Sequence, residues 1–346
     1  MKLTWTDNPV GPMPRPRELC RTADTPLRPT ASSGRAGSNE RVAADPTMDT
    51  APRTLTVLVN PKAGGEREQL AAATDALGRA GTTLRLVDMD PAGSHLGPLR
   101  EQAPAIDGIV VAGGDGTVSR LLPELVALGK PVGVLPMGTA NDLARTLGIP
   151  FDGAGAAEVI LQGTTRPIDL GRANGIYFCN AAGIGASVQV SRELDRTEKS
   201  AWGVLAYGRA VWRVLERAPG FRVSVDCSDG VTYHGRATQV TIANGVHYGG
   251  GMTVHETAAI DDGELDLLVL RPESPLHYLR HFLAFRRGRY QRAAAVWAGR
   301  AHRVEVRTAR ARDCALDGEI RTRTPVAISI ERHALEVFVP RHSGDG

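Results

Sequence analysis

Apolar residues after position 54 occur in short, near-continuous runs that are separated by segments with helical spacing. The runs that we expect to be strands are Leu55 to Val59, Leu84 to Val87, Ile109 to Ala112 and Val132 to Leu135. A helix is expected over residues 66–80, a short helix before the third strand, and a loop and helix after the fourth. Apolar strands that alternate with helices are typical of a parallel sheet covered on both faces, whose ligands bind beyond the carboxyl ends of the strands.

From about Pro167 the pattern changes to strands in which apolar and polar residues alternate. The strands expected there include Arg222 to Cys227, Thr238 to Ala243, Leu265 to Leu270, Val304 to Arg307 and Val326 to Ile330. This period of two favours antiparallel pairing in a sandwich. Helical stretches over residues 191–216 and 275–287 interrupt the strands. The predicted fold class is therefore α/β, with an N-terminal doubly wound parallel sheet followed by a C-terminal antiparallel β-sandwich.

The region before the first strand has a different composition. Residues 1–52 are rich in Pro, Arg, Thr, Ala and Gly, and the prolines break any periodic pattern, so we expect a disordered extension. Met48, just before the first strand, is a candidate translation start. The remaining chain is long enough for two cores, and no run approaches the roughly 18 apolar residues of a membrane span.

Cysteine and charge patterns narrow the class of protein further. Cys20, Cys179, Cys227 and Cys314 are scattered without a Cys-x-x-Cys pair, so we expect reduced thiols in a cytoplasmic protein. Residues 271–346 carry 15 Arg against 8 Asp plus Glu, although the net charge of the whole chain is +3. This excess indicates either an anionic partner or arginines that are merely solvated.

The loop from Gly113 to Ser119 has a composition suited to phosphate binding. Its three glycines let the backbone turn tightly and approach a ligand without obstruction by Cβ atoms. A helix that begins near Thr117 directs free N–H groups and the positive end of its dipole toward an anion. Asp115 is a candidate ligand for a metal ion held by the phosphates. For this loop alone, a purely structural turn is the alternative.

Three other loops carry polar residues suited to the same chemistry. Asn60 to Gly65 follows the first strand, and its backbone amides should face the same edge of the sheet. In the loop after the fourth strand, Thr139 is expected to be the N-cap of a helix with Asp142 in its first turn, which leaves the Asn between them unexplained. Asp317-Gly318-Glu319 places two carboxylates in a basic region, with a hairpin turn as the structural alternative.

Taken together, the loops resemble those of the bacterial branch of the diacylglycerol kinase catalytic-domain family, which includes sphingosine and ceramide kinases and is more distantly related to NAD kinases. The segments that carry the resemblance are Asn60 to Gly64, Gly113 to Thr117, Gly138 to Asp142, Asn180 to Gly185, Asn244 to Gly251, Asp261 to Gly263, and Asp317 to Glu319. NAD kinases share the second segment. The third and the last favour a lipid kinase.

The resemblance implies two domains with ATP in the cleft between them. Residues 53–165, together with about 333–346, would form the nucleotide-binding α/β domain, and 166–332 the β-sandwich that takes the lipid acceptor. The residues implied for the nucleotide are Asn60, Pro61, Lys62, Ala63, Gly64, Gly113, Gly114, Asp115, Gly116, Thr117, Val118, Ser119, Thr139 and Asn141. Glu319 would be the general base toward a lipid hydroxyl, with Asp317 beside it and Asp115 at the catalytic Mg²⁺.

A second, structural Mg²⁺ site is also implied by the resemblance. It would consist of the Asp262 side chain and the backbone carbonyls of Ala259 and Glu264, with a simple turn at Asp262 as the alternative. The chain departs from the family pattern at a few positions, which bear on nucleotide affinity rather than on the base. They are Met89, Ser119, Arg120 and Glu256.

The function expected from the resemblance is ATP- and Mg²⁺-dependent phosphorylation of a hydroxyl on a diacylglycerol-like membrane lipid. The protein would act at the inner face of the membrane, without nucleic acid, and a homodimer is left open. The alternatives are a kinase of a soluble polyol or dinucleotide, and a nucleotide-binding regulator without catalysis.

A basic helix is expected to dock the protein on anionic membrane. Leu276, Leu279, Phe282 and Leu283 recur at helical spacing, and the charge is supplied by Arg280, Arg286, Arg287, Arg289 and Arg292. The alternative is that the apolar stripe packs on the β domain.

Overall fold

The computed structural model describes residues 54–60, 67–90, 96–162, 164–189, 192, 220–255, 257–273 and 296–341. They belong to one compact unit, Ala51–Gly346. The predicted N-terminal extension and the helix predicted over 275–287 lie outside these residues, as does the helix predicted over 191–216 except for residue 192. No helix in the described ranges is long and apolar enough to cross a membrane.

Four parallel strands begin the first sheet. They are β1 (Thr54–Val59), β2 (Thr83–Asp88), β3 (Gly108–Gly113) and β4 (Val132–Pro136). Their order is β2-β1-β3-β4, and each neighbouring pair is parallel. Every residue of β3 and β4 is buried, as expected for central strands covered on both faces. The near-continuous apolar runs therefore predicted these strands correctly, to within a residue at each end.

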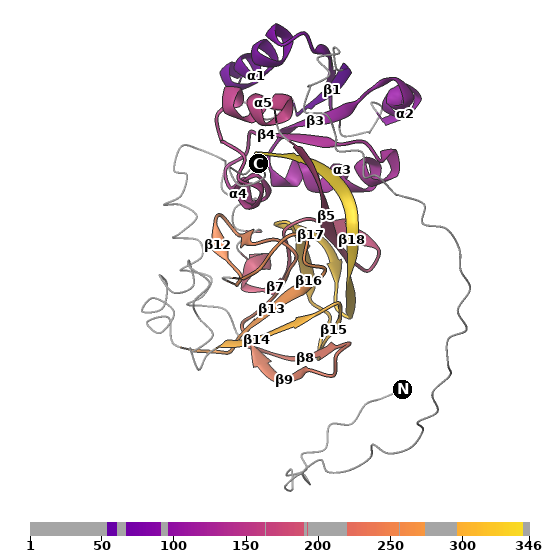
Figure 1. Cartoon of the computed structure of the whole chain (residues 1–346). Coiled ribbons are helices and arrows are strands. Elements are labelled where there is room, and N and C mark those ends of the chain that lie inside the picture. Colours follow the sequence, from indigo (N-terminus) through magenta and orange to yellow (C-terminus); the bar gives the residue numbers. More distant parts are fainter. Residues whose placement is uncertain are drawn as a thin grey trace, which may run out of the picture. The chain divides into compact units, whose positions relative to one another are not determined.

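Helices cover both faces of these strands. The helices are α1 (Arg67–Arg79), α2 (Leu96–Gln102), a 3-10 turn (Ala103–Ala105), α3 (Asp115–Leu128), α4 (Asp142–Leu147) and α5 (Gly153–Gln162). Figure 1 shows α1 beside α5 on one side of the sheet and α2 and α3 on the other. Helix α3 ends at Gly129, which adopts the left-handed region (φ 59°) and donates its N–H to the carbonyl of Leu125.

A second sheet forms one layer of a β-sandwich. Among the described residues its order is β14-β13-β10-β7-β16-β17, and its paired neighbours are antiparallel. The strands are β7 (Ala181–Gly185), β10 (Gln239–Ala243), β13 (Leu265–Leu270), β14 (Val296–Ala301), β16 (Asp313–Leu316) and β17 (Glu319–Arg323). Its buried apolar residues pack against those of the first sheet to form the second core.

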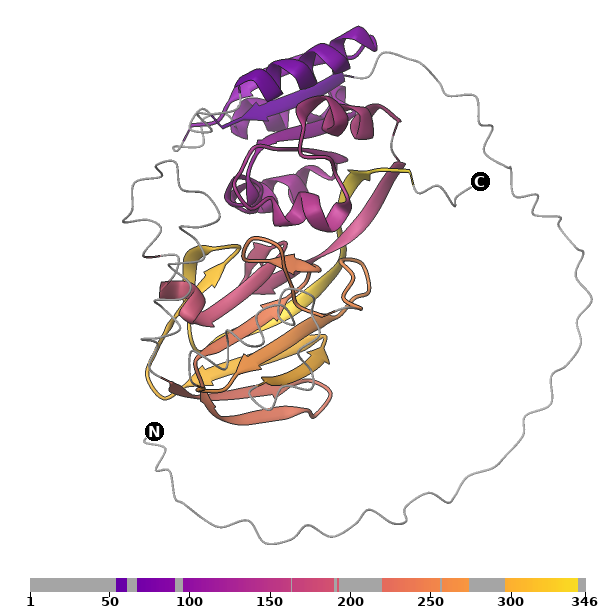
Figure 2. The same ribbon diagram turned by 90° about the vertical axis from the view of Figure 1, so that its left-hand side faces the viewer.

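The first sheet continues from β4 into the other layer of the sandwich through β18 (Val326–Val339), in the order β4-β18-β15-β8-β9. The remaining strands are β5 (Thr164–Ala173), β6 (Ile176–Phe178), β8 (Phe221–Cys227), β9 (Thr232–Ala237), β15 (Arg303–Thr308), and the short pair β11 (His247–Tyr248) and β12 (Met252–Thr253). Strand β18 is parallel to β4 at Val337 and antiparallel to β5. Figure 2 shows β18 (yellow) and β5 (pink) running together from the parallel strands to the sandwich.

Strand β18 is much longer than the predicted segment Val326 to Ile330. The polar run Glu331 to His333 suggested an end, but the strand passes it through an irregularity in register. His333 takes a positive φ of 52°, and its N–H donates to Oδ1 of Asp169 at 2.7 Å. Asp169 is 1% exposed, and its second oxygen accepts the N–H of Gly263 at 2.7 Å. A buried carboxylate from another strand therefore compensates the backbone where the ladder is interrupted.

The predicted fold class is confirmed, because the described chain has a helix-covered parallel sheet with its own core and an antiparallel sandwich with a second. Cys179, Cys227 and Cys314 are free and buried, which places these thiols in the core as predicted. Burial raises the pKa of Cys314 to about 12, so its thiol stays protonated at neutral pH. Cys20 lies outside the described residues.

Candidate active site

The glycine-rich turn between β3 and α3 is closed against the loop after β4 through contacts that only glycine permits. A Cβ at Gly114 would lie 2.8 Å from the Cα of Gly138, and a Cβ at Gly138 would lie 2.6 Å from the Cα of Gly114. Helix α3 begins at Asp115, two residues before the predicted start. Its first N–H groups lie at the carboxyl end of the parallel strands, where an anion can use them.

The other residues predicted to hold a nucleotide fall into three groups. Asn60 directly follows β1, and its Nδ2 donates to Oγ1 of Thr117 at 3.0 Å, which joins the loops after β1 and β3. Val118 and Ser119 are each 1% exposed, so a nucleotide contact there would have to involve their backbone. The third group, Pro61, Lys62, Ala63 and Gly64, lies outside the described residues.

Asn141, which the sequence left unexplained, closes the loop after β4. Its Oδ1 accepts the N–H of Gly138 at 2.8 Å, and its Nδ2 donates to the carbonyl of Gly138 at 2.7 Å. The residue takes a left-handed φ of 48° and is the N-cap of α4, so the expectation that Thr139 caps this helix is wrong. Thr139 is instead exposed in the loop. The side chain of Asn141 is thus already engaged by its own loop, whereas Thr139 is open to a ligand.

Asp115 links the glycine-rich turn to the start of α4. Its Oδ2 accepts the N–H of Asp142 at 3.0 Å, and its Oδ1 accepts the N–H of Leu143 at 3.0 Å. Oδ1 also accepts a hydrogen bond from Nδ2 of Asn180 at 3.2 Å. A carboxylate has about four lone-pair positions, so these three donors leave roughly one for a further ligand. The carboxylate of Asp115 therefore supplies the capping bonds that α4 lacks from its own N-cap.

Asp317 occupies the first position of the two-residue turn between β16 and β17. Asp317 and Gly318 both have positive φ, 47° and 85°, as a tight hairpin turn of this kind requires. The hairpin reading of the Asp-Gly pair is therefore correct for the backbone. The side chain does more, because its oxygens accept the N–H groups of Cys179, Asn180 and Ala181 at 2.9, 2.8 and 3.1 Å.

Asn180 connects these two carboxylates. Asp317 holds its backbone, and its side-chain amide donates to Asp115. The other side-chain atom, Oδ1, is buried and has no hydrogen-bond partner. Sequence reasoning quoted Asn180 within a motif but gave it no role. The sequence did contain a feature that could have identified it, because Asn180 is a polar residue between two short apolar strands, β6 and β7.

Glu319 lies over the glycine-rich turn. A Cβ added to Gly116 would come within 3.0 Å of Oε1 of Glu319, so the carboxylate approaches the backbone of that turn closely. Oε1 lies 3.1 Å from the guanidinium of Arg120, and Oε2 lies 2.9 Å from that of Arg321. The side chain is 37% exposed. A glutamate from β17 and the turn after β3, far apart in sequence, thus lie together with two arginines. Arg120 was expected to bear on nucleotide affinity rather than on the base, and this expectation is wrong because its guanidinium pairs with Glu319. Arg321 had no role predicted from the sequence.

Asp142 ties α4 to the loop between β11 and β12. Its oxygens accept the N–H groups of Gly250 at 2.9 Å and Gly251 at 2.7 Å. Burial raises the pKa of the Asp142 carboxyl, and the two N–H donors oppose that shift. Because Asp142 is 4% exposed, these bonds fix the position of the loop rather than bind a ligand. The sequence suggested only a first-turn carboxylate favoured by the helix dipole.

The structural Mg²⁺ site predicted from the Asp262 side chain and the backbone carbonyls of Ala259 and Glu264 stays a prediction, and a cationic side chain already lies beside its carboxylate. Arg300 lies 3.8 Å from Oδ2 of Asp262, 3.0 Å from Oε2 of Glu264 and 2.8 Å from Oδ1 of Asp266. Oδ1 of Asp262 accepts the N–H of Glu264 at 3.0 Å, which is the turn alternative. The guanidinium thus offsets these carboxylates already. No group of three or more His, Cys, Asp or Glu in the described chain is arranged to hold a metal ion, but the predicted site has only one such side chain.

Because Arg300 already offsets the carboxylates at this place, chelation is expected to leave the stability of the protein unchanged. EDTA should not lower the midpoint of thermal unfolding, whereas Arg300→Gln should lower the free energy of unfolding by about 1–3 kcal/mol, because Asp266 is 5% exposed and loses its cation. Thermal unfolding of the wild type with EDTA and with Mg²⁺ checks the first expectation, and unfolding of Arg300→Gln beside the wild type checks the second. If EDTA lowers the unfolding midpoint of the wild type and Mg²⁺ reverses this, the result supports the predicted metal site and contradicts the expectation.

Two family models cover most of the chain. The model described as diacylglycerol kinase catalytic domain matches residues 54–173. The model described as YegS C-terminal NAD kinase beta sandwich-like domain matches residues 180–339. The first includes the glycine-rich turn and the loop after β4, and the second includes Asn180, Asp317 and Glu319.

Individual proteins give the same relationship over nearly their whole length. A diacylglycerol kinase of Bacillus subtilis is 30% identical over 298 residues, which are 84% of this chain and 97% of that protein. A diacylglycerol kinase of Staphylococcus aureus is 29% identical over 293 residues, covering 82% of this chain and 91% of that protein. A solved structure of a candidate diacylglycerol kinase from Bacillus anthracis superposes with a TM-score of 0.70 at 27% identity, covering 83% and 97% of the two chains.

Proposed function

Because the chain belongs to the diacylglycerol kinase catalytic-domain family, we propose that it is an ATP-dependent lipid kinase that phosphorylates a hydroxyl of a diacylglycerol-like membrane lipid. The observation that carries this proposal is the position of Glu319, whose carboxylate lies against the glycine-rich turn at Gly116. A general base for the incoming hydroxyl has to lie beside the terminal phosphate of the bound nucleotide. A carboxylate next to the phosphate-binding turn meets this requirement. The division into a nucleotide domain and an acceptor domain belongs to the same proposal.

The phosphates of ATP would bind to the backbone of the glycine-rich turn. The first N–H groups of α3 and its dipole favour negative charge there, and the glycines admit the ligand without Cβ atoms in the way. Exposed Thr139 lies in the adjoining loop, which the contact between Gly114 and Gly138 holds against the turn. Asn60 and Thr117 support the same loop edge through their hydrogen bond.

Glu319 would take the proton from the lipid hydroxyl as the new bond to phosphorus forms. Arg120 and Arg321 hold the two oxygens of its carboxylate, so the side chain has a fixed direction. In this proposal the same guanidinium groups would lie beside the transferred phosphoryl group and would stabilise the negative charge that accumulates on it. Asp317 would act as a positioning residue, because its oxygens are engaged by three backbone N–H groups rather than directed at a substrate.

Asp115 and Asn180 are the residues that fit a catalytic Mg²⁺. Asp115 retains about one lone-pair position, and Oδ1 of Asn180 is a buried oxygen without a partner beside it. Both are oxygen donors of the kind that a hard cation prefers. Bound Mg²⁺ would neutralise charge on the ATP phosphates. Asp115 and Asn180 would then orient the nucleotide relative to Glu319.

The proposed acceptor requires the enzyme to work at a membrane surface. The basic helix expected over residues 275–287 lies outside the described residues, so its docking role is part of the proposal. Neutralising Arg286, Arg287 and Arg289 together should weaken binding to anionic vesicles, because each charge contributes on the order of 1 kcal/mol near such a surface. Vesicle co-sedimentation at low salt measures this. Equal binding of variant and wild type would remove these arginines from the docking surface.

The proposed function is tested by incubating the purified protein with labelled ATP, Mg²⁺ and a total lipid extract. Labelled phosphate in the lipid fraction, lost with Glu319→Gln, is the expected result. Label in a soluble product instead would identify a kinase of a polyol or dinucleotide. Binding of ATP without turnover on lipid or soluble acceptors would identify a regulator without catalysis.

A further inference from the structure

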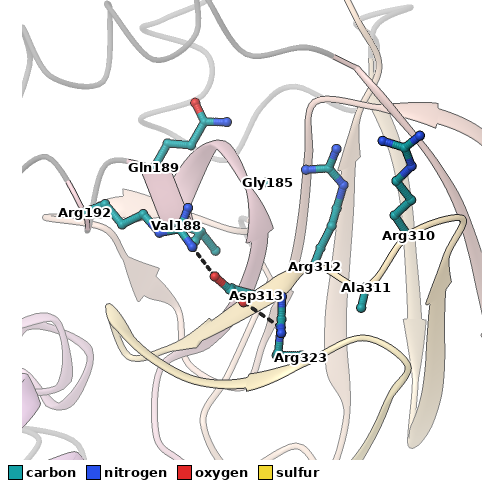
Figure 3. Close-up of a pocket in the computed structure, with 9 residues that line it drawn as sticks. All are labelled: Gly185, Val188, Gln189, Arg192, Arg310, Ala311, Arg312, Asp313 and Arg323. Carbon is teal, nitrogen blue, oxygen red and sulfur yellow. Dashed lines mark hydrogen bonds and ion pairs between the residues drawn. The ribbon is translucent and has the colours of Figure 1, made fainter.

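A charged pocket lies in the sandwich, away from the glycine-rich turn. Figure 3 shows it at the end of β7, marked by Gly185, and at the start of β16, marked by Asp313. Asp317 follows the opposite end of β16, about 13 Å away at the usual rise of about 3.3 Å per residue. The cavity volume is about 320 Å³. Arginines 192, 310, 312 and 323 line it, against the single carboxylate of Asp313.

The one carboxylate is already used by two of the arginines. Asp313 pairs with Arg192, and its Oδ1 lies 2.8 Å from Nε of Arg323. The structure gives Arg310 and Arg312 no ion pair with any described residue. Their side chains point in the same direction beside the pocket, while Arg192 and Arg323 converge on Asp313 (Figure 3). The pocket therefore has two positive charges that no carboxylate in the described chain offsets.

The two uncompensated arginines come from a segment with a fixed backbone. The N–H of Arg312 donates to Oγ1 of Thr324 at 2.9 Å, and its carbonyl accepts the N–H of Thr324 at 2.8 Å. The carbonyl of Arg310 accepts the hydroxyl of Thr308 at 2.8 Å. This backbone presents both side chains before any ligand arrives, which reduces the entropy lost on binding.

Of Arg310 and Arg312, Arg312 pays the larger free-energy cost for a charge without a carboxylate partner. It is partly buried, and its guanidinium lies 4.2 Å from the ring centre of Phe221. Burial lowers the pKa of Arg312, which reflects the cost of holding a charge away from water. A second hollow of about 180 Å³ lies between Phe221 and the same two arginines. An anion in the pocket would offset the charge, and the hollow would accept an apolar part of the ligand.

We propose that this pocket binds a phosphate group through Arg310 and Arg312. Guanidinium groups match phosphate oxygens with paired, charge-assisted hydrogen bonds, and a cavity of this size admits a phosphate ester. The phosphate can belong to the headgroup of a phospholipid or to a soluble phosphate ester. The site is separate from the one proposed for ATP, so it would let the protein sense a phosphorylated compound while the glycine-rich turn is occupied.

The test compares two double variants with the same change in charge. Arg310→Gln with Arg312→Gln removes the proposed ligands, and Arg85→Gln with Arg303→Gln removes two exposed arginines for which the structure gives no ion pair in the described ranges. Binding of glycerol 3-phosphate is measured by calorimetry. Binding to phosphatidylcholine vesicles with and without phosphatidylglycerol is measured by flotation. A saturating non-hydrolysable ATP analogue is present throughout, so that the nucleotide site cannot take the probe.

We expect the pocket variant to bind at least one probe about tenfold or more weakly than the control variant, since each lost charge-assisted bond is worth about 1.5–3 kcal/mol. Loss confined to phosphatidylglycerol vesicles assigns the site to a membrane headgroup, and loss confined to glycerol 3-phosphate assigns it to a soluble ester. Equal binding of both variants to both probes overturns the proposal. Arg310→Gln alone, at an exposed position, keeps the test valid if the double variant unfolds.

Discussion

Glu319→Gln is expected to lower turnover by about 10²- to 10⁴-fold and to leave the affinity for ATP nearly unchanged. The amide keeps the shape of the side chain but cannot accept the proton of the lipid hydroxyl. Nucleotide affinity should not fall, because Arg120 and Arg321 lose their counter-charge and remain beside the phosphate-binding turn. Single-turnover phosphorylation measures the chemical step, and calorimetry with the ATP analogue measures binding.

Glu305→Gln is a matched control for this variant. Glu305 also pairs with an arginine, Arg307, and its side chain is 42% exposed, compared with 37% for Glu319. The control should keep the turnover of the wild type, because Glu305 lies on β15 outside the proposed site. If Glu319→Gln retains more than about half of the turnover when chemistry is rate-limiting, Glu319 is not the base.

The central strands β3 and β4 could be predicted from sequence because their burial on both faces leaves a near-continuous apolar run, whereas the edge strand β2 is partly exposed and includes Arg85. The same reasoning failed at the end of β18. There the strand continues past the polar residues Glu331 to His333, where Asp169, more than 160 positions earlier in the chain, accepts the N–H of His333. Local patterning carries no information about such a partner, so the predicted strand stopped short.

The loops of the site could be predicted together for a similar reason, since the carboxyl ends of parallel strands share one edge of a sheet. What individual side chains do there depended on distant partners. Asn141 bonds to its own loop, and Arg300 comes from β14 to lie beside Asp262, whose carboxylate had suggested a metal. Asn and Arg can bind ligands or make structural contacts within the protein. Only the residues that lie next to them in space show which of these two roles each side chain has.

Asp115→Asn is the second change with a large expected effect, because this carboxylate serves both the fold and the proposed metal. The amide would turn an N–H₂ group toward the N–H of Asp142 or Leu143, which should lower the free energy of unfolding by about 1–3 kcal/mol. It also loses the charge that attracts Mg²⁺. We therefore expect the binding of ATP with Mg²⁺ to weaken at least tenfold more than the binding of ATP without metal.

Asp142→Asn separates these two effects. It disturbs the same region, because Asp142 accepts the N–H groups of Gly250 and Gly251, but it keeps the carboxylate of Asp115. This variant should lose stability to a similar extent while ATP binds with the same preference for Mg²⁺ as in the wild type. Titrating ATP with and without Mg²⁺ into each variant gives the comparison. Equal weakening of both forms of ATP in Asp115→Asn would mean that Asp115 shapes the loops and does not hold the metal, which would leave Asn180 as the remaining oxygen donor of the pair.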